Sequence, residues 1–546
     1  MLKNCIFKTK FQKFFFKPGM IFLSCPVLFL FLLFTNSPCH AKKPDQIRKI
    51  AVNYDQEKGL HSKVFKECVG AGRANEGLRA DWQQQLKMVQ DEIGFKYIRF
   101  HGLLCDDMGI YKEDRDGNPM YNWQYIDLLF DYLLSVNLTP FVELGFMPSA
   151  LASGKKTIFW WKGNVTPPKS YEKWADLIRN LVLHWEQRYG REALLKWYFE
   201  VWNEPDLPQF FTGTMEEYFK LYDVTVKEIK GICQDYRVGG PSSASPYKYE
   251  IEFVKHCVAN NIPVDFVSTH CYGVQQGFLD EFGNHGTLLD MDPNAVTSRM
   301  VHSRELIAQS PLPNLELHFT EWSSSYTPVD PIHDAYHSAA FILDKVKGTE
   351  AHVNSLSYWV FTDIFEEAGP RWEPFHGGFG MLNYQGIKKP AYYAYYYLSQ
   401  LGDVELLNED KFSWACKDDK GGIQILFWNF KPKQAADSVN NQVYFKRDLP
   451  PESATDVEIN ISQLPGNTWF LQIFKVGYRV NDAQSTYHDL GSPAQLTPQQ
   501  VSIIKRMNNN VPVSSEFVKI TGGKFVKKLN VRENDVLLLK LEKIRK

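Results

Sequence analysis

Two glutamates in this chain each follow an apolar stretch that ends abruptly. Glu204 lies in the segment WYFEVWNEPDLP, residues Trp197–Pro208, directly before Pro205. Glu321 lies near the end of the apolar stretch LELHFTEW, residues Leu315–Trp322. An apolar run bounded by a turn signal is typical of a strand buried on both faces, and a proline cannot donate to a strand ladder. Each glutamate is therefore predicted to lie at the carboxyl end of a buried strand.

A pair of carboxylates at strand ends is the minimum equipment for hydrolysing a glycosidic bond. One carboxyl protonates the leaving oxygen while the other attacks the anomeric carbon, and a separation of about 5–5.5 Å predicts retention of configuration. One of the two glutamates would need a proton while the other is ionised, and repulsion between neighbouring carboxylates favours that arrangement. A single strand-end glutamate more often caps a helix or lies in a surface loop, so the prediction depends on the pair.

The stretches around these two segments alternate between strand-like and helix-like patterns. Strand-like stretches occur at Glu67–Gly72, Lys96–Leu104, Thr139–Met147, Trp197–Trp202, Arg237–Gly240, Asp265–Tyr272, Leu315–Trp322 and Ser355–Asp363. Stretches with helical spacing of apolar residues follow them at Leu78–Ile93, Tyr125–Leu134, Trp174–Trp185, Tyr218–Ile229, Ile251–Ala259, Val296–Gln309, His333–Val346 and Pro390–Leu401. This alternation predicts an α/β fold, a (β/α)8 TIM barrel with its chemistry at the carboxyl ends of the strands. A doubly wound open sheet is the alternative, but it does not explain why polar residues recur at several strand ends.

The pattern changes after about residue 402. Strand-like stretches occur at Gly422–Phe430, Asn441–Phe445, Thr468–Phe474 and Asp535–Leu541, and helical spacing is clear only at Pro498–Met507. We therefore expect a catalytic barrel over residues 42–401 and a β-sandwich domain over residues 402–546. An early strand at Ile47–Val52 could join the sandwich.

Residues 1–41 have the pattern of a signal peptide. A basic segment from Lys3 to Lys17 precedes an apolar segment from Met20 to Phe34, and small residues follow at Cys39-His40-Ala41. This order predicts export and cleavage, and hence a periplasmic or secreted bacterial protein with no membrane association after cleavage. An uncleaved anchor is the alternative, and lipidation of Cys39 stays open.

Composition excludes several other classes of protein. The 546 residues are 44% hydrophobic and carry a net charge of −2, which describes a globular chain without the basic surface that nucleic acids require. The nine cysteines show no CxxC pair, and we interpret those after residue 41 as mostly buried thiols. We expect no metal site, no phosphate-binding loop and no cofactor, and the oligomeric state is not predicted.

Six stretches give the chain a resemblance to glycoside hydrolase family 39, and most of all to its β-xylosidases. They are FKYIRFHGLLCDDMGIY (Phe95–Tyr111), FVELGFMP (Phe141–Pro148), GNVTPP (Gly163–Pro168), WNEPDLP (Trp202–Pro208), FTEWSSSY (Phe319–Tyr326) and HGGFGM (His376–Met381). The resemblance spans the predicted barrel and extends more weakly into the C-terminal region. It implies a barrel with a β-sandwich and a retaining mechanism.

The resemblance also implies roles for single residues. Glu204 matches the general acid/base, Glu321 the nucleophile, and Asn203 the residue that hydrogen-bonds the sugar 2-hydroxyl. Seven further residues match positions that line the sugar subsite, namely His101, His270, Tyr272, Tyr326, Trp359, Glu366 and Glu367. Without the resemblance, the histidines read equally as core residues, Trp359 as barrel packing, and Glu366 with Glu367 as a solvated loop pair.

Four other residues carry weaker expectations. Glu143 and Glu200 lie inside strand-like stretches, and we interpret them as supporting or core polar residues. Trp322 and Asp206 depart from the family pattern, which has a tyrosine and an asparagine at these positions, and either departure could alter contacts with the leaving group.

We therefore expect an exo-acting, retaining β-xylosidase that releases xylose from xylo-oligosaccharides. An α-L-iduronidase-like enzyme is disfavoured because no clear basic cluster accompanies the sugar-contact residues to bind a uronate carboxylate. Activity on β-glucosides, galactosides or arabinopyranosides stays open. A sugar-binding protein on a degenerate barrel is disfavoured because both glutamates are present.

Overall fold

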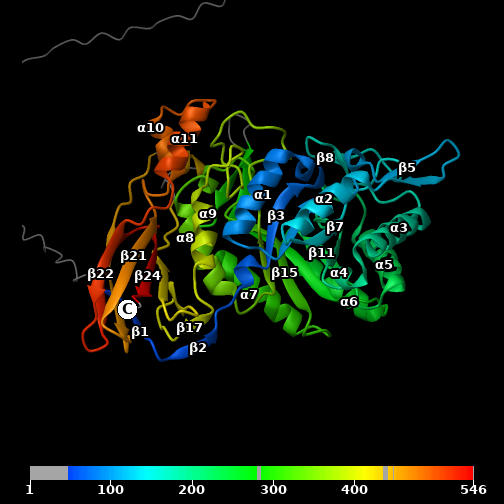
Figure 1. Ribbon diagram of the computed structural model, residues 1–546. Helices are drawn as coiled ribbons and strands as arrows, with labels where there is room; N and C mark the ends of the chain where they lie inside the picture. The colour runs from blue at the N-terminus through cyan, green and yellow to red at the C-terminus, as the bar shows by residue number, and fades with distance from the viewer. Residues whose placement is uncertain (1–46, 280–284, 434–440, 447, 545–546) are drawn as a thin grey trace, which may run out of the picture. The chain divides into compact units, whose positions relative to one another are not determined.

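Eight parallel strands form a closed barrel in the computed structural model, which describes residues 47–279, 285–433, 441–446 and 448–544 (Figure 1). In chain order the strands are β3 (Cys68–Arg73), β4 (Tyr97–His101), β7 (Thr139–Leu144), β10 (Tyr198–Val201), β11 (Arg237–Ser243), β12 (Phe266–Tyr272), β15 (Glu316–Ser323) and β16 (Ser355–Tyr358). Each strand pairs with the next, and β16 closes the ring on β3 through Tyr358 and Val69. The predicted (β/α)8 barrel is confirmed. The predicted signal peptide lies outside the described residues.

Helices connect the strands and cover the barrel. They are α1 (Ala80–Glu92), α2 (Gln124–Ser135), α3 (Tyr171–Tyr189), α4 (Arg191–Leu194), α5 (Met215–Ile232), α6 (Lys248–Ala259), α7 (Ala295–Ala308), α8 (His337–Thr349) and α9 (Pro390–Ser399). Helix α3 buries Trp174, Leu177, Leu181 and Trp185 along one stripe, as its helical spacing predicts. Several predicted boundaries differ from the structure, two of them near the end of the barrel. The helix expected from His333 begins as the 3-10 turn η4 (Pro331–His333), and the strand expected to reach Asp363 ends at Tyr358.

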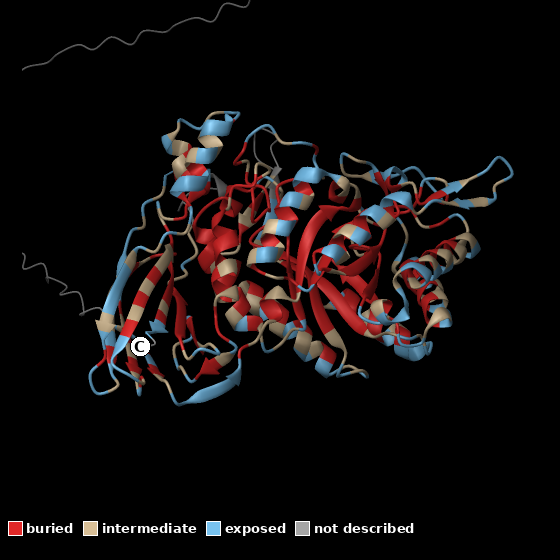
Figure 2. Ribbon diagram, viewed as in Figure 1, coloured by how far each residue is buried: buried red, intermediate tan, exposed pale blue. Residues whose placement is uncertain are grey.

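The barrel interior is packed with aromatic rings at one end and is charged at its centre. Near the strand N-termini, Phe141 stacks on Tyr198 at 4.8 Å between ring centroids, and Tyr198 meets Phe266 edge-on at 5.2 Å. These rings fill the end of the barrel, so the interior is packed there and is not a pore. The barrel strands are coloured as buried in Figure 2, and the charged residues Arg99, Glu143 and Glu200 on them are at most 1% exposed.

Three hairpins extend the loops that follow barrel strands. They are β5 (Tyr111–Glu113) with β6 (Pro119–Tyr121), β8 (Thr157–Ile158) with β9 (Gly163–Asn164), and β13 (Val274–Leu279) with β14 (His285–Leu289). Short 3-10 turns also occur, at η1 (Val64–Lys66), η2 (Ala74–Leu78) and η3 (Asp106–Met108).

Two further sheets follow the barrel and share one apolar core. The larger sheet has the order β2 (Glu57–Leu60), β17 (Val404–Leu406), β18 (Ser413–Lys417), β19 (Ile423–Trp428), β24 (Val536–Lys543), β21 (Thr468–Val476) and β22 (Ser514–Lys519). The smaller sheet has the order β1 (Arg48–Asn53), β20 (Ala454–Ser462) and β23 (Phe525–Arg532). Ile50, Ile459, Ile425 and Leu539 belong to one buried cluster, so the two sheets pack as a sandwich.

Both ends of the described chain contribute to the sandwich. Strand β1 pairs in parallel with β20, and β2 pairs with β17. A strand near Ile47–Val52 is predicted by the sequence, whereas all four residues of Glu57–Leu60 are exposed and show no strand-like pattern. Helices α10 (Ala483–Asp489) and α11 (Pro498–Met507) complete this region, and α11 begins with a capping box between Thr497 and Gln500.

The predicted strand at Asn441–Phe445 is wrong. This segment forms the 3-10 helix η5 (Asn441–Lys446). Phe445 packs with Leu289, Ile332 and Ala335 in a small buried cluster, so the apolar residue is used in packing on the barrel side and not in a strand ladder.

None of the described helices is long and apolar enough to cross a membrane. The six cysteines of the described residues are free thiols, five of them buried, as their spacing suggested.

Candidate active site

Glu204 lies in a tight turn directly after β10. Trp202 and Glu204 have φ angles of 73° and 46°, a left-handed conformation that costs residues with side chains about 1 kcal/mol or more. The turn is stabilised where the backbone amide of Glu204 donates to the carbonyl of Ser242 at 2.8 Å. Pro205 ends the strand. The turn holds Glu204, a residue that is 8% exposed, within the site at the carboxyl end of the barrel.

Glu321 lies within β15 and is held at both of its carboxylate oxygens. Tyr272, at the end of β12, donates its hydroxyl to Oε2 at 2.6 Å. On the other side, Nη1 of Arg99 donates to Oε1 at 2.5 Å, and Nε2 of His101 lies 3.3 Å from the same oxygen. These contacts fix the orientation of the carboxylate.

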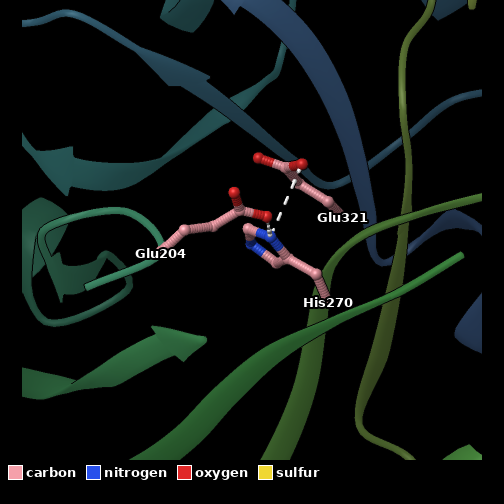
Figure 3. Close-up of side chains that lie close together, drawn as sticks. All are labelled: Glu204, His270 and Glu321. Carbon is pink, nitrogen blue, oxygen red and sulfur yellow. Dashed lines mark hydrogen bonds and ion pairs between the residues drawn. The ribbon is translucent and has the colours of Figure 1, made fainter. Parts of the chain in front are cut away.

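The imidazole of His270 lies between the two glutamates (Figure 3). Its Nδ1 is 2.7 Å from Oε1 of Glu204 and 3.5 Å from Oε2 of Glu321. At least one carboxylate oxygen of Glu204 lies within 4.8 Å of one of Glu321. The structure therefore brings the two predicted catalytic glutamates together.

A chain of hydrogen bonds connects Arg99 with Glu204. Nη2 of Arg99 donates to Oγ of Ser242 at 3.0 Å, and the same oxygen lies 3.1 Å from Nε2 of His270. Since Arg99 can only donate, Ser242 has its own hydrogen available for Nε2 of His270. In that tautomer, Nδ1–H of His270 donates to Glu204.

Arg99 is the cation at the centre of the site. Its guanidinium donates to Oε2 of Glu200 at 2.8 Å and to Oδ1 of Asn203 at 2.8 Å, and it lies 2.9 Å from Oε2 of Glu143. Burial of a charge requires such partners, because an unpaired guanidinium in the barrel would lose its hydration without compensation. The bond to Asn203 takes the amide oxygen and fixes which way the amide NH2 points.

Burial and charge separate the protonation states of the two glutamates. Burial, together with the negative charges of Glu321 and Asp206, raises the pKa of Glu204 well above its usual range. Burial also raises the pKa of Glu321, but Arg99, His101 and Tyr272 all oppose that rise. Glu204 is therefore the carboxyl that keeps the proton.

Both histidines of the site are neutral. Burial is the main cause that lowers the pKa of His101 to about 3, and burial also lowers the pKa of His270 well below its usual value. Nδ1 of His101 is 2.6 Å from Oε2 of Glu143, which orients the ring so that Nε2 faces Glu321. Both rings are thus hydrogen-bonding groups and not cations.

The side chains of Glu366 and Glu367 lie in different surroundings. Glu366 is paired with Arg73 at 3.0 Å and with Arg79 at 2.9 Å, so its charge is used in a network at the edge of the site. Oε1 of Glu367 lies 3.7 Å from Nε2 of His101, inside the site. Burial is the main cause that raises the pKa of Glu367 well above its usual range, and Glu321 contributes.

The two predicted aromatic residues lie at different depths. Trp359 is 1% exposed, with its ring 4.7 Å from that of His101 and beneath the guanidinium of Arg99. Tyr326 is 48% exposed and meets Tyr272 edge-on at 6.2 Å. Trp359 thus belongs to the interior of the site and Tyr326 to its rim.

The two residues that depart from the family pattern, Trp322 and Asp206, have structural contacts. Trp322 is fully buried, and its ring stacks at 6.2 Å on Phe341 of α8. Oδ1 of Asp206 accepts a hydrogen bond from the backbone amide of Ala244 at 2.8 Å.

One group among the described residues has the spacing to hold a metal ion, and it is the site itself. It consists of Glu204, His270 and Glu321. Nδ1 of His270 already forms a hydrogen bond with Oε1 of Glu204, and Arg99 places a positive charge on Glu321, which disfavours a second cation. The geometry is explained by the hydrogen bonds alone.

The central role of Arg99 is not among the predictions from the sequence. Its place within the strand-like stretch Lys96–Leu104 does not by itself predict a role in catalysis. A signal was available, because a charged residue within a buried strand needs a partner, and Glu143, Glu200 and Glu321 lie in other strand-like stretches. The interpretation of Glu143 and Glu200 as supporting polar residues fits their contacts with Arg99.

Comparison with known proteins points to one family of glycoside hydrolases. A family model described as glycosyl hydrolases family 39 matches residues 48–523. The chain is 37% identical over 489 residues to a β-xylosidase of Geobacillus stearothermophilus, covering 88% of this chain and 93% of that protein. Among solved structures, the family 39 enzyme of Xanthomonas axonopodis pv. citri is 39% identical and has a TM-score of 0.88. The match covers 93% of this chain and 99% of that chain. A monomeric β-xylosidase of Caulobacter crescentus CB15 is 40% identical and has a TM-score of 0.87. The match covers 91% of this chain and 100% of that chain.

Proposed function

The chain belongs to glycosyl hydrolase family 39, and we propose that it is an exo-acting β-xylosidase that releases xylose with retention of configuration. The observation that carries the proposal is the pairing of a protonated Glu204 with an arginine-bound Glu321 across a gap of at most 4.8 Å between two of their oxygens. Inverting enzymes place their carboxyls about 6.5–9.5 Å apart to admit water between sugar and base. The short gap therefore favours direct attack by a glutamate.

On this proposal the first step forms a covalent sugar ester. An oxygen of Glu321 attacks the anomeric carbon, the bond from that carbon to the leaving oxygen breaks, and Glu204 transfers its proton to the leaving oxygen. Tyr272 and Arg99 hold the attacking carboxylate in place. The amide NH2 of Asn203, oriented by Arg99, is positioned to donate to the sugar 2-hydroxyl as positive charge develops.

The second step reverses the roles of Glu204. Once Glu321 is esterified its negative charge is lost, so the main charge that raises the pKa of Glu204 disappears and Glu204 is stable as a carboxylate. It then removes a proton from water, which attacks the anomeric carbon and releases Glu321. Two displacements at one carbon restore the starting configuration.

The preference for xylose rests on the relatives. The two β-xylosidases named above cover most of this chain at 37% and 40% identity. Arg99 and Arg73 are not available to a uronate, because Arg99 is paired with Glu200 and Glu321, and Arg73 with Asp107 and Glu366.

The test uses purified protein without residues 1–41 and 4-nitrophenyl β-D-xylopyranoside. We expect rapid hydrolysis by the parent enzyme and a loss of at least about a thousandfold in kcat for Glu321→Gln. NMR of the first product should show β-xylose before mutarotation. With Glu321→Gly, added azide should yield the glycosyl azide of inverted configuration.

Glu316→Gln is the matched control, since Glu316 lies at the opposite end of the same strand and bonds to Tyr198 and His318. It should keep the parental kcat. Parental activity in Glu321→Gln would disprove the nucleophile assignment. First release of α-xylose would disprove retention.

A panel of other glycosides tests the glycone. If the parent is inactive on the xyloside but cleaves a β-glucoside, β-galactoside, α-L-arabinopyranoside or α-L-iduronide, the xylose preference is wrong while the catalytic pair stands. Binding of sugars without hydrolysis of any would instead indicate a non-catalytic sugar-binding protein.

We also propose that the protein is exported and cleaved near residue 41, on the pattern of residues 3–41. The full-length chain expressed in a bacterial host should be recovered from the periplasm or medium with its N-terminus at Lys42. A cytoplasmic product with an intact N-terminus would contradict export, and a lipid mass on Cys39 would indicate a lipoprotein.

A further inference from the structure

An exposed tryptophan lies at the tip of the β8–β9 hairpin, next to the active site. Trp160 is 56% exposed, whereas its neighbours Phe159 and Trp161 are partly buried. Phe159 stacks at 6.0 Å on His101, and Trp161 lies 6.0 Å from Phe146. The two inward rings anchor the turn on the site, and the ring between them faces solvent.

The turn is held in an unfavourable backbone conformation. Phe159 has a φ of 65° and Lys162 a φ of 59°, values that cost residues with side chains about 1–3 kcal/mol each. Such strain persists only where packing imposes it, and it is concentrated at functional sites. Here Phe159 and Trp161 pack inward on either side of Trp160, whose side chain is exposed.

Trp160 is also anchored to the loop that carries Glu367. Its backbone amide donates to the carbonyl of Glu367 at 2.7 Å. Its ring covers Gly369, where an added Cβ would lie only 3.2 Å from the indole Cδ1. Glu367 in turn lies 3.7 Å from Nε2 of His101, which is 3.3 Å from the nucleophile Glu321. The indole is thus an ordered surface at the rim of the site.

Exo action determines which part of a substrate could meet this surface. In an exo-acting enzyme the terminal sugar fills the pocket around Glu321, and nothing extends beyond its non-reducing end. The only part of an oligosaccharide outside that pocket is the side of the leaving group. Indole is suited to this side, since its flat apolar face can cover the C–H face of a pyranose while the hydroxyls stay in water.

We propose that Trp160 is the stacking platform for the second sugar of the oligosaccharide, the one released as the leaving group. The inference rests on the proposed exo-glycosidase function and deepens it. It states that the rim of the site recognises a second sugar as the leaving group, and not an arbitrary aglycone. Trp160 acts on specificity and takes no part in bond making or breaking.

The test compares two substrates that share a glycone and differ in the leaving group. Xylobiose has a second pyranose, and β-D-xylopyranosyl fluoride has none. Trp160→Ala should lower kcat/KM for xylobiose about tenfold and leave kcat/KM for the fluoride within about twofold of the parent. Trp160→Phe should restore part of the loss on xylobiose, since a smaller ring remains.

Trp372→Ala is the matched control, because Trp372 is a tryptophan of the β16–α9 loop that is 83% exposed. It should leave both substrates unaffected. Equal losses on the two substrates in Trp160→Ala would show that Trp160 supports the pocket and not the second sugar, and parental activity on both would show that it does not touch substrate. Either result overturns the proposal.

The design separates this inference from the proposed function. If the parent enzyme prefers another glycone, the disaccharide and the fluoride of that glycone replace those of xylose, and the comparison decides the role of Trp160 in the same way. A second measurement is independent of turnover. In the Glu321→Gln background, xylobiose should quench tryptophan fluorescence more than xylose does, and Trp160→Phe should abolish that difference.

Discussion

Nη1 of Arg99 lies 2.5 Å from Oε1 of Glu321, inside the barrel and out of contact with solvent. The same guanidinium contacts Glu200 and Glu143, so one cation is surrounded by three carboxyl groups. This arrangement favours the ionised form of the nucleophile in a site whose burial otherwise disfavours charge. The separation of protonation states between Glu321 and Glu204 depends on it.

We predict that Arg99→Lys lowers kcat at least about a hundredfold, because a lysine cannot reproduce the planar fork that contacts Glu321, Glu200 and Asn203 together. Weaker support of the Glu321 charge also raises its pKa, so the acid limb of the kcat/KM profile should move to higher pH. Arg304→Lys is the control, since Arg304 donates to backbone carbonyls outside the site. An unchanged acid limb in Arg99→Lys would contradict this role.

The pKa of Glu204 should fall when the charge of Glu321 is removed. Burial and the Glu321 charge are the two largest causes of its raised pKa, and Glu321→Gln removes the second. We expect its pKa to decrease, measured by 13C NMR of the labelled glutamate carboxyls. The Glu204→Gln/Glu321→Gln double variant assigns the resonance. A pKa that stays the same would show that burial alone accounts for the protonated acid.

Stability at mildly acidic pH should depend on His337. Burial is the main cause that lowers the pKa of His337 to about 3 in the folded protein, while the unfolded chain takes up a proton near its ordinary value of about 6.5. Between these two pH values the unfolded state binds more protons than the folded state. The contribution of neutral His337 to stability is therefore present above pH 6.5 and is lost as the pH falls.

His337→Phe should therefore gain stability relative to the parent on acidification. We expect the difference in the free energy of unfolding to change by about 2 kcal/mol in favour of the variant between pH 6.5 and pH 5, measured with urea. His302→Gln, at a side chain that is 51% exposed, should show no such trend. A constant difference in His337→Phe would contradict the prediction.

A buried lysine should dominate the stability of the loops beyond β16. Lys389 is fully buried, and its ammonium lies 2.6 Å from Asp334 and 3.0 Å from Asp363, and donates to the carbonyl of Gly378 at 2.7 Å. Lys389→Met leaves two buried carboxylates without their cation, which should cost about 3–5 kcal/mol in urea unfolding.

The adjacent lysine provides the control for that experiment. Lys388 forms a partly exposed pair with Glu92 at 2.6 Å, so Lys388→Met should cost at most about 1 kcal/mol. Similar losses in the two variants would show that the buried network is not special.

Much of the barrel could be predicted because its signals are local. Each buried strand is a short apolar run, and each helix carries apolar residues every three or four positions, so the order of elements follows from neighbouring residues alone. The segment Asn441–Phe445 shows where this fails. Its apolar residues match a strand, but Phe445 packs beside Ile332 as part of a 3-10 helix, and no local pattern records that distant contact.

The candidate site divides in the same way. The strand-end positions of Glu204 and Glu321 are a property of the chain, since an apolar run and Pro205 suffice to indicate them. The residues that contact Arg99 come from strands far apart in the sequence. Arg99 and Glu321, for example, are separated by more than a hundred residues. Their meeting depends on barrel closure and on the register of neighbouring strands, which sequence spacing does not encode.

What the sequence by itself determined is the order of the elements and the identity of the two acids, because strand periodicity and chain-breaking residues act over a few positions. Only the tertiary structure decided the rest. Glu366 and Glu367 are neighbours with the same side chain, yet one pairs with Arg73 and the other faces His101. Trp160 lies between two aromatic residues of similar character, and it alone is exposed. In both cases the physical reason is that packing of distant segments, and not residue type, sets the direction of a side chain and hence its charge environment and access to substrate.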